Sequence, residues 1–329
     1  MMGLGVISKY RTQLMGIAAI LILVCHAPGN NVLMPQFLLK LCEQGQYGVD
    51  IFLFLSGVGL SYSMQKANLQ KTGMGGHYRW YLKRYKKIFL PYMIIAFPYC
   101  FYKYLFEDSS IISLFFNFST LGYWVNGSGP WFMSLLIWLY LLAPLLYRLI
   151  LLKHQYLVFT LSLIIMLLCQ YSHYDGWMYY TLSAICRIPS FLLGIGIANM
   201  IKENKTFEWW WSLFAVFLII LAYIYFPNSY SKWILIIPIC YFLAVLFSKI
   251  GKICCSILTF FGVISLESYL FNIYLGDILN HKSWVILGYD FSYGHYIEYC
   301  AVLIIGTAAA YYTNRLKMKI FNNSSLIIQ

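Results

Sequence analysis

Long apolar stretches alternate along this chain with short breaks that hold most of its polar and turn-forming residues. A transmembrane helix needs about 20 predominantly apolar residues, and the apolar stretches are close to this length. The breaks carry turn-forming runs such as Pro28-Gly29-Asn30-Asn31 and Pro227-Asn228-Ser229. The pattern predicts an all-α fold, a polytopic integral membrane helix bundle with about ten transmembrane helices, in a single domain over residues 1–329. The expected spans cover residues 12–28, 48–65, 88–105, 130–152, 155–171, 180–201, 209–226, 233–248, 256–275 and 295–314.

The composition supports a membrane protein and argues against a soluble domain. Hydrophobic residues make up 61% of the chain and charged residues only 10%, whereas a soluble domain carries about 25% charged residues. Aromatic residues reach 19%, and Tyr and Trp are enriched at the two membrane interfaces. The 9 cysteines show no zinc-ligand spacing, so no metal site is expected.

Lysine and arginine positions predict the orientation of the bundle. If the N-terminus is cytoplasmic, 18 of the 23 basic residues fall in inside loops, while Arg187 lies within a span. The outside loops hold only Lys40, Lys103, Lys232 and Lys282. Because cytoplasmic loops of membrane proteins are enriched in Lys and Arg, we expect both termini to be cytoplasmic. Topology therefore accounts for the basic excess, and no nucleic-acid partner is expected.

Four ionisable residues lie within the expected spans, where such groups are costly and mark functional sites. They are His26, Asp50, Arg187 and Glu267. Arg187 and Glu267 are expected at comparable depth. They form either a structural ion pair or the lining of a polar cavity shared with His26, and the sequence leaves both interpretations open.

His26 and Asp50 belong to the first two expected spans, which form a hairpin that brings them to similar depth. An imidazole polarised by a carboxylate is a general base that can take a proton from a hydroxyl. In the alternative interpretation, His26 is a polar tip at the membrane interface and Asp50 a helix-start residue favoured by the helix dipole. On these residues alone the two interpretations are equal.

A resemblance to a known family changes this balance. Several segments of the chain resemble the motifs of the membrane-bound acyltransferase-3 family and follow one another in that family's order over about residues 10 to 310. No single motif is specific, but the ordered combination is. The segments are 10–20 with His26-Ala27, Gly48-Val49-Asp50-Ile51-Phe52 with Ser56-Gly57, Lys83–Pro91, Gly129–Leu135, Arg187–Gly194 and Ile264–Leu270.

The resemblance implies an acyltransferase that transfers groups other than aminoacyl groups. Members of this family move acetyl or longer acyl groups from cytoplasmic acyl-CoA to hydroxyls, commonly those of envelope or exported sugars. We therefore expect an O-acyltransferase, foremost an O-acetyltransferase, in a cell membrane such as the bacterial inner membrane. Its partners would be acyl-CoA as donor substrate, a carbohydrate or glycolipid acceptor and membrane lipid, with no permanently bound cofactor.

The resemblance also implies roles for individual residues. His26 would be the catalytic base and Asp50 its orienter. The basic stretch Lys83–Pro91 would hold the CoA phosphates through charge-assisted bonds. The alternative is that this stretch is a positive-inside signal that contacts anionic lipid. The donor-binding candidates are Lys83, Arg84, Lys87 and Arg11, and the candidates for the substrate site are Arg187, Glu267, Trp131 and Tyr269.

One departure from the family pattern concerns the mechanism. The family has an Arg separated by ten residues from the histidine of its first helix, and that position in this chain is Met15. Arg11 lies one turn further toward the cytoplasm, and helical side chains lean toward the N-terminus, away from His26. Arg11 is thus expected to contribute from the cytoplasmic end without replacing the missing residue.

Two other classes of function remain open on the sequence. A transporter or flippase for a lipid-linked sugar would also line its pathway with charges, but transporters commonly show repeats and helices broken at matched positions. We find no repeat, and the internal prolines Pro98, Pro144, Pro189 and Pro238 do not recur at matched positions. A non-catalytic assembly partner is the third class, which Met15 keeps open.

Overall fold

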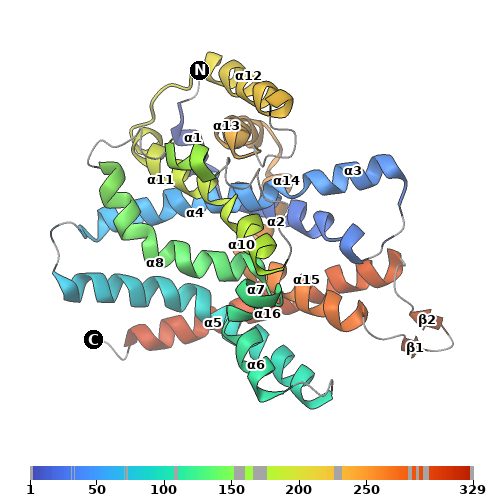
Figure 1. The fold of residues 1–329 in the computed structure, drawn as a ribbon. Coiled ribbons are helices and arrows are strands. Elements are labelled where there is room, and N and C mark those ends of the chain that lie inside the picture. The colour runs from blue at the N-terminus through green and yellow to red at the C-terminus, as the bar shows by residue number, and fades with distance from the viewer. Residues whose placement is uncertain are drawn as a thin grey trace. The chain divides into compact units, whose positions relative to one another are not determined.

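The fold is helical apart from one short hairpin in the part of the chain that the computed structural model describes (Figure 1). This part comprises residues 3–30, 32, 34–69, 71, 73–106, 110–151, 160–165, 176–225, 232–280, 284–286, 289–291 and 296–326. The α-helices are α1 (Gly5–Lys9), α2 (Arg11–Cys25), α3 (Gln36–Gln44), α4 (Tyr47–Lys66), α5 (Met74–Phe106), α6 (Ile111–Phe118), α7 (Leu121–Asn126), α8 (Trp131–Leu151), α10 (Trp177–Ile185), α11 (Ile188–Lys202), α12 (Trp210–Tyr225), α13 (Ile236–Phe247), α14 (Lys252–Val263), α15 (Ser265–Asn280) and α16 (Tyr296–Leu326). Two 3-10 helices, η1 (Pro28–Asn30) and η2 (Lys232–Leu235), and the antiparallel strands β1 (Trp284–Ile286) and β2 (Tyr289–Phe291) complete the description.

Several of these helices are long and apolar enough to cross a membrane. Among the described residues there are 5 such segments, or up to 6 if α14 and α15 form one bent span. The segments are Arg11–Asn30, Gln36–Lys66, Met74–Phe106, Trp131–Ile150 and Trp177–Lys202. The helical, multi-pass membrane architecture is thereby supported. The count of about ten spans and the cytoplasmic side of both termini stay predictions, and most of the expected span 155–171 lies outside the described residues.

The helix α5 begins earlier than the sequence pattern predicts. The charges of the basic stretch before residue 88 indicate a loop, yet this stretch lies within the first turns of the helix. Aromatic residues in these turns of α5 contact other helices: Trp80 donates a hydrogen bond to Ser63 at 2.7 Å and Tyr85 donates one to the carbonyl of Ile137 at 2.9 Å. Tertiary contacts therefore extend the helix into a polar segment.

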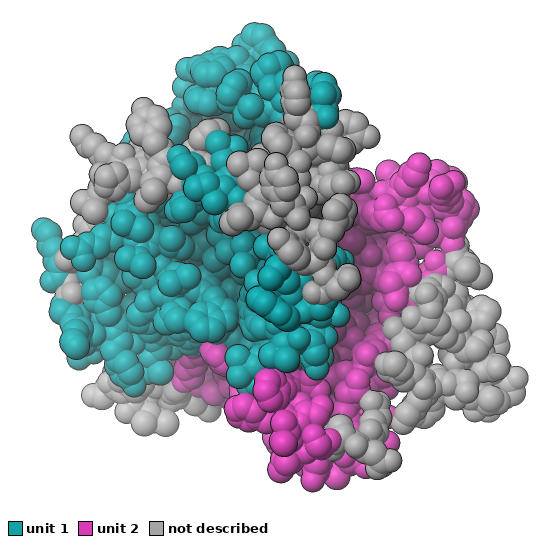
Figure 2. Space-filling model, in the orientation of Figure 1, with its two compact units in different colours: residues 1–14, 49–85, 119–255 teal, residues 15–48, 86–118, 256–329 magenta. Residues whose placement is uncertain are grey.

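The chain divides into two compact units, each built from three stretches of sequence (Figure 2). Unit 1 comprises residues Met1–Leu14, Val49–Tyr85 and Ser119–Cys255, and unit 2 comprises Met15–Gly48, Lys86–Phe118 and Ser256–Gln329. The single domain expected over residues 1–329 stays a prediction.

Glycines bring α4 and α11 together in unit 1. A Cβ on Gly57 would collide with the carbonyl of Phe191, and a Cβ on Gly194 would collide with the carbonyl of Phe54. Small residues of this kind let the backbones of membrane helices approach closely. The close approach brings the polar first turns of these two helices within hydrogen-bonding distance of each other.

Glycines play the same role in unit 2. Gly16 of α2 lies against the carbonyl of Leu258 in α14, and Gly48 lies against the carbonyl of Ala18 in α2. A side chain at either position would push these helices apart. This packing holds the C-terminal half of α2, which ends just before His26.

A bend of 67° separates α14 from α15 within the expected span 256–275. Asn314 of α16 supports the bend, since its amide donates to the carbonyl of Val263 at 3.1 Å and to Glu267 at 3.2 Å. Glu267, which is 1% exposed, also forms an ion pair with Lys317. Its contacts in the structure thus connect α15 to α16.

Candidate active site

His26 follows the last residue of α2, where the helix tightens before it ends. Its backbone N–H donates to Ile22 at 3.1 Å, and the next N–H, that of Ala27, donates to Val24 at 3.2 Å. The ring is half-buried and its centroid lies 6.2 Å from that of Tyr269 on α15. The structure therefore brings two of the candidate residues, His26 and Tyr269, into one site.

A neutral amide holds the imidazole of His26. Its Nδ1 lies 2.6 Å from Oδ1 of Asn272, a residue of α15 that is only 2% exposed. The Nδ2 of Asn272 donates to the hydroxyl of Tyr299 at 3.3 Å, and this hydroxyl donates to the backbone carbonyl of Leu23. Within the described residues, Nε2 of His26 makes no hydrogen bond. All four residues belong to unit 2.

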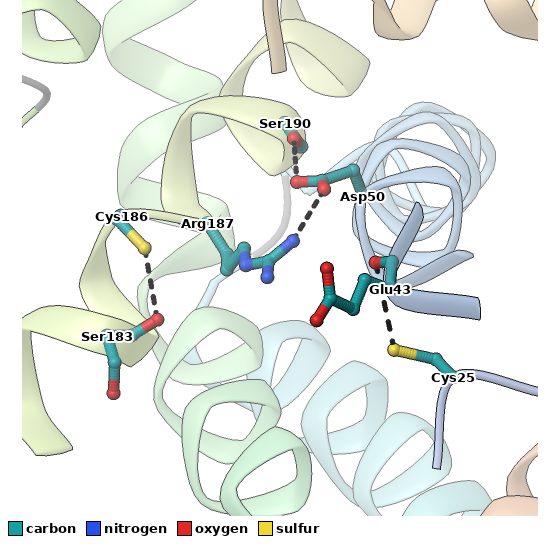
Figure 3. Close-up of polar contacts among 7 residues, drawn as sticks. All are labelled: Cys25, Glu43, Asp50, Ser183, Cys186, Arg187 and Ser190. Carbon is teal, nitrogen blue, oxygen red and sulfur yellow. Dashed lines mark hydrogen bonds and ion pairs between the residues drawn. The ribbon is translucent and has the colours of Figure 1, made fainter. Parts of the chain in front are cut away.

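Asp50 lies in a second polar cluster, in unit 1 (Figure 3). Its carboxylate is fully buried; Oδ2 accepts a hydrogen bond from Arg187 at 2.7 Å and Oδ1 accepts one from Ser190 at 2.7 Å. Charge-assisted bonds of this kind are the strong ones in proteins. Burial makes the pair costly to break, because either charge alone would be left in an apolar environment.

Local sequence explains why the cluster forms at this place. Asp50 is in the first turn of α4, and Arg187 and Ser190 are at the start of α11. A carboxylate is stabilised near the positive ends of helix dipoles. Trp131, the first residue of α8, stacks against the guanidinium of Arg187, with 6.0 Å between the charge centre and the ring centroid. Arg187 and Trp131, both substrate-site candidates, are therefore brought together.

Each of the four ionisable candidates contacts residues of its own unit. Arg187 pairs with Asp50 in unit 1, and Glu267 pairs with Lys317 in unit 2. An ion pair between Arg187 and Glu267 stays a prediction. Asp50 and His26 belong to different units and each has partners within its own unit. The role of Asp50 as the orienter of His26 stays a prediction.

Two arginines of the donor-binding set come together in unit 1. Arg11 donates to the carbonyl of Leu55 at 3.2 Å. Its guanidinium lies beside Gly59, in the space that a larger side chain at this position would fill. Arg11 also interacts electrostatically with Arg84 and with Tyr140. In the described residues, the Nε atoms of both arginines are buried without a hydrogen-bond partner. Like charges that lie close together without a carboxylate favour an anionic ligand.

The lysines of the basic stretch lie differently. Lys83 and Lys87 are exposed on α5, while Arg84 is half-buried. The predicted donor-binding set thus divides into two arginines near each other and two solvent-facing lysines. Among the described residues, no group of three His, Cys, Asp or Glu side chains comes close enough to hold a metal ion.

Three residues of these clusters, Asn272, Tyr299 and Ser190, were not predicted from the sequence. Asn272 stands in the apolar segment of α15, and a neutral polar residue at membrane depth is a weaker signal than the ionisable groups that the prediction used. Tyr299 had no distinguishing signal among 30 tyrosines. Asn272 and Tyr299 are therefore recognised only through their contacts in the structure.

Comparison with known proteins adds one finding. The model of a family described as "Acyltransferase domain" (Acyl_transf_3) matches residues 13–325, nearly the whole chain. Neither a curated protein nor a solved structure matches the chain.

Proposed function

The chain belongs to the acyltransferase 3 family, and on this premise we propose that it moves an acyl group, foremost acetyl, from cytoplasmic acyl-CoA to a hydroxyl of an envelope or exported carbohydrate. Family membership and its apolar helices make it a multi-pass membrane acyltransferase. The donor, the acceptor and the chain length of the acyl group are the parts that we propose.

The observation that carries this proposal is the environment of His26. A half-buried imidazole at the end of a spanning helix has one nitrogen held by Asn272, and its other nitrogen has no hydrogen-bond partner among the described residues. A general base needs such a nitrogen within reach of the proton that it removes. The arrangement favours acyl transfer over a purely structural role, in which both nitrogens would be satisfied.

The proposed reaction is a single exchange of bonds at the thioester carbonyl. Nε2 of His26 accepts the proton of the acceptor hydroxyl while the hydroxyl oxygen attacks the acyl carbon. A carbon–oxygen bond forms and the carbon–sulfur bond of acyl-CoA breaks. The CoA thiolate leaves and recovers the proton from His26, so the products are the ester and free CoA thiol.

The paired arginines support a donor site in unit 1. Arg11 and Arg84 place two guanidinium groups near each other, and their contacts within the described part of the chain include no carboxylate. Phosphates of CoA would supply the missing negative charge through charge-assisted bonds. Guanidinium groups suit this task, because their planar fork matches phosphate oxygens.

We expect the variants Arg84→Gln and Arg11→Gln each to weaken acetyl-CoA binding by about 10–100-fold, since a hydrogen bond to a charged group contributes about 1.5–3 kcal/mol. Lys87→Gln should have a smaller effect because this lysine is exposed. Titration calorimetry on the purified protein measures the affinities. Arg79→Gln is the matched control, an exposed arginine on the same helix. Equal affinity in wild type and both arginine variants would refute the donor site.

The whole activity is tested by comparing cells with and without the gene. Mass spectrometry of envelope glycans and glycolipids should show a species heavier by one acyl group that disappears on deletion and returns on complementation. The same mass difference identifies the acyl chain and the acceptor together. Unchanged masses, combined with a changed distribution of a lipid-linked sugar across the membrane, would replace the proposal with the transporter interpretation.

A further inference from the structure

The hydrogen bonds around His26 form a chain that begins and ends on the same turn of α2. Tightening of the last turn directs the N–H of Ala27 to Val24, which leaves the carbonyl of Leu23 available to the hydroxyl of Tyr299. Tyr299 accepts from Asn272, and Asn272 contacts His26. Asn272 and Tyr299 are both buried, at 2% and 7% exposure, so water does not compete for these groups.

The donor and the acceptor in each of these hydrogen bonds follow from the carbonyl of Leu23, where the series ends. The carbonyl of Leu23 has no proton to give, so the hydroxyl of Tyr299 is the donor to it. The oxygen of Tyr299 then accepts from Nδ2 of Asn272, which turns Oδ1 of Asn272 toward His26. Oδ1 can only accept, so Nδ1 of His26 carries the proton. A neutral imidazole has one ring proton, and Nε2 is left with its lone pair.

From this geometry we propose that Asn272 and Tyr299 are positioning residues that lock His26 in the Nδ1–H tautomer and aim Nε2 at the acceptor hydroxyl. This inference rests on the proposed function, in which His26 is the base. The backbone carbonyl of Leu23 sets the tautomer, Tyr299 fixes the orientation of the amide, and the amide fixes the ring. The group that holds the ring in this lock is a neutral amide.

The tautomer is read directly by nuclear magnetic resonance of protein labelled at histidine and reconstituted in lipid nanodiscs. The signal of His26 is assigned by its loss in His26→Gln. We expect the Nδ1–H form in wild type and a shift toward the Nε2–H form in Asn272→Leu. The kcat for CoA release should be about 10–100-fold lower, because part of the roughly 10²–10⁴-fold contribution of a general base is lost. The KM for acetyl-CoA should stay unchanged, because the donor contacts are intact. Asn272→Asp keeps an acceptor for Nδ1–H and should restore the wild-type tautomer.

Tyr299→Phe provides a milder second variant. Loss of the hydroxyl removes the constraint on the amide of Asn272, which can then rotate and present Nδ2 to the ring, so a mixture of tautomers is expected. Tyr123→Phe is the matched control: it removes the hydroxyl of another buried tyrosine, which donates to the backbone carbonyl of Tyr180 at 2.7 Å in unit 1. The tautomer of His26 should not change in this control.

Two results would overturn the inference: an Nε2–H signal for His26 in wild type, or the same tautomer in wild type, Asn272→Leu and Tyr299→Phe. Failure of the proposed function gives a different result. In that case wild type would release no CoA from acetyl-CoA, or His26→Gln would release it as fast as wild type, whatever the tautomer of the wild-type ring.

Discussion

Replacing His26 with Ala is expected to lower the rate of acyl transfer by about 10²–10⁴-fold while the protein still inserts and folds. This factor is the usual contribution of a general base and corresponds to about 3–5 kcal/mol of activation free energy. The ring is half-buried at the end of α2, so its truncation removes the base without opening a large cavity in the core. Release of free CoA from acetyl-CoA by the detergent-purified variant measures the loss.

His77→Ala is the matched control for this experiment. His77 is in the first turn of α5 and its Nδ1 contacts the backbone carbonyl of residue 73 at 3.3 Å, away from the contacts made by His26. Its loss should leave the rate close to that of wild type. A His26→Ala variant with wild-type turnover would remove the catalytic assignment and favour a transporter or an assembly role.

The second large effect is expected at the buried ion pair of unit 1. Asp50→Asn or Arg187→Met should each destabilise the protein by about 3–5 kcal/mol, because the remaining charge is buried without its counterion. Asp50 is 0% exposed and Arg187 is 8% exposed, with 2.7 Å between the paired atoms. The double variant should lose less than the sum of the two single variants, since it leaves no uncompensated charge.

Thermal unfolding of the purified protein, followed by the loss of its monodisperse peak in size-exclusion chromatography, compares these variants. Glu203→Gln serves as the control, because the pair of Glu203 with Lys205 is exposed and separated by 3.2 Å. Exposed pairs contribute about 0–1 kcal/mol, so this variant should unfold at the same temperature as wild type. Unaltered stability in Asp50→Asn would mean that the pair is not a structural element. The transfer rate of well-folded Asp50→Asn then tests separately whether Asp50 acts on His26.

Much of the architecture could be predicted from the sequence, because a membrane constrains sequence strongly. A helix in lipid must satisfy its own backbone and present apolar side chains, so the apolar stretches predicted the all-helical, multi-pass fold. The ordered motifs between residues 10 and 310 predicted the family, and the matching model covers residues 13–325. Costly ionisable residues also directed attention to His26, Asp50, Arg187 and Glu267, each of which has specific polar contacts.

The partners of those residues were decided only by the tertiary structure. Depth within a span can be estimated from sequence, but the face of a helix that meets a given neighbour depends on packing. Gly57 and Gly194 bring α4 against α11 in unit 1, where Arg187 pairs with Asp50. In unit 2, Glu267 of α15 pairs with Lys317 of α16. The start of α5 is a similar case, because side-chain contacts outweighed the charges that suggested a loop.

The sequence by itself determined which groups are candidates for chemistry, and the tertiary structure determined how they are held. His26 stands out as a candidate base because an imidazole in an apolar segment is rare and costly. Its partner Asn272 is 246 residues away, and Tyr299 reaches back over 276 residues to Leu23. Hydrogen bonds of this kind depend on distance and direction in space, which no local pattern records. Neutral residues are also harder to recognise from the sequence than charged residues, because burying a paired amide costs far less free energy than burying an ion.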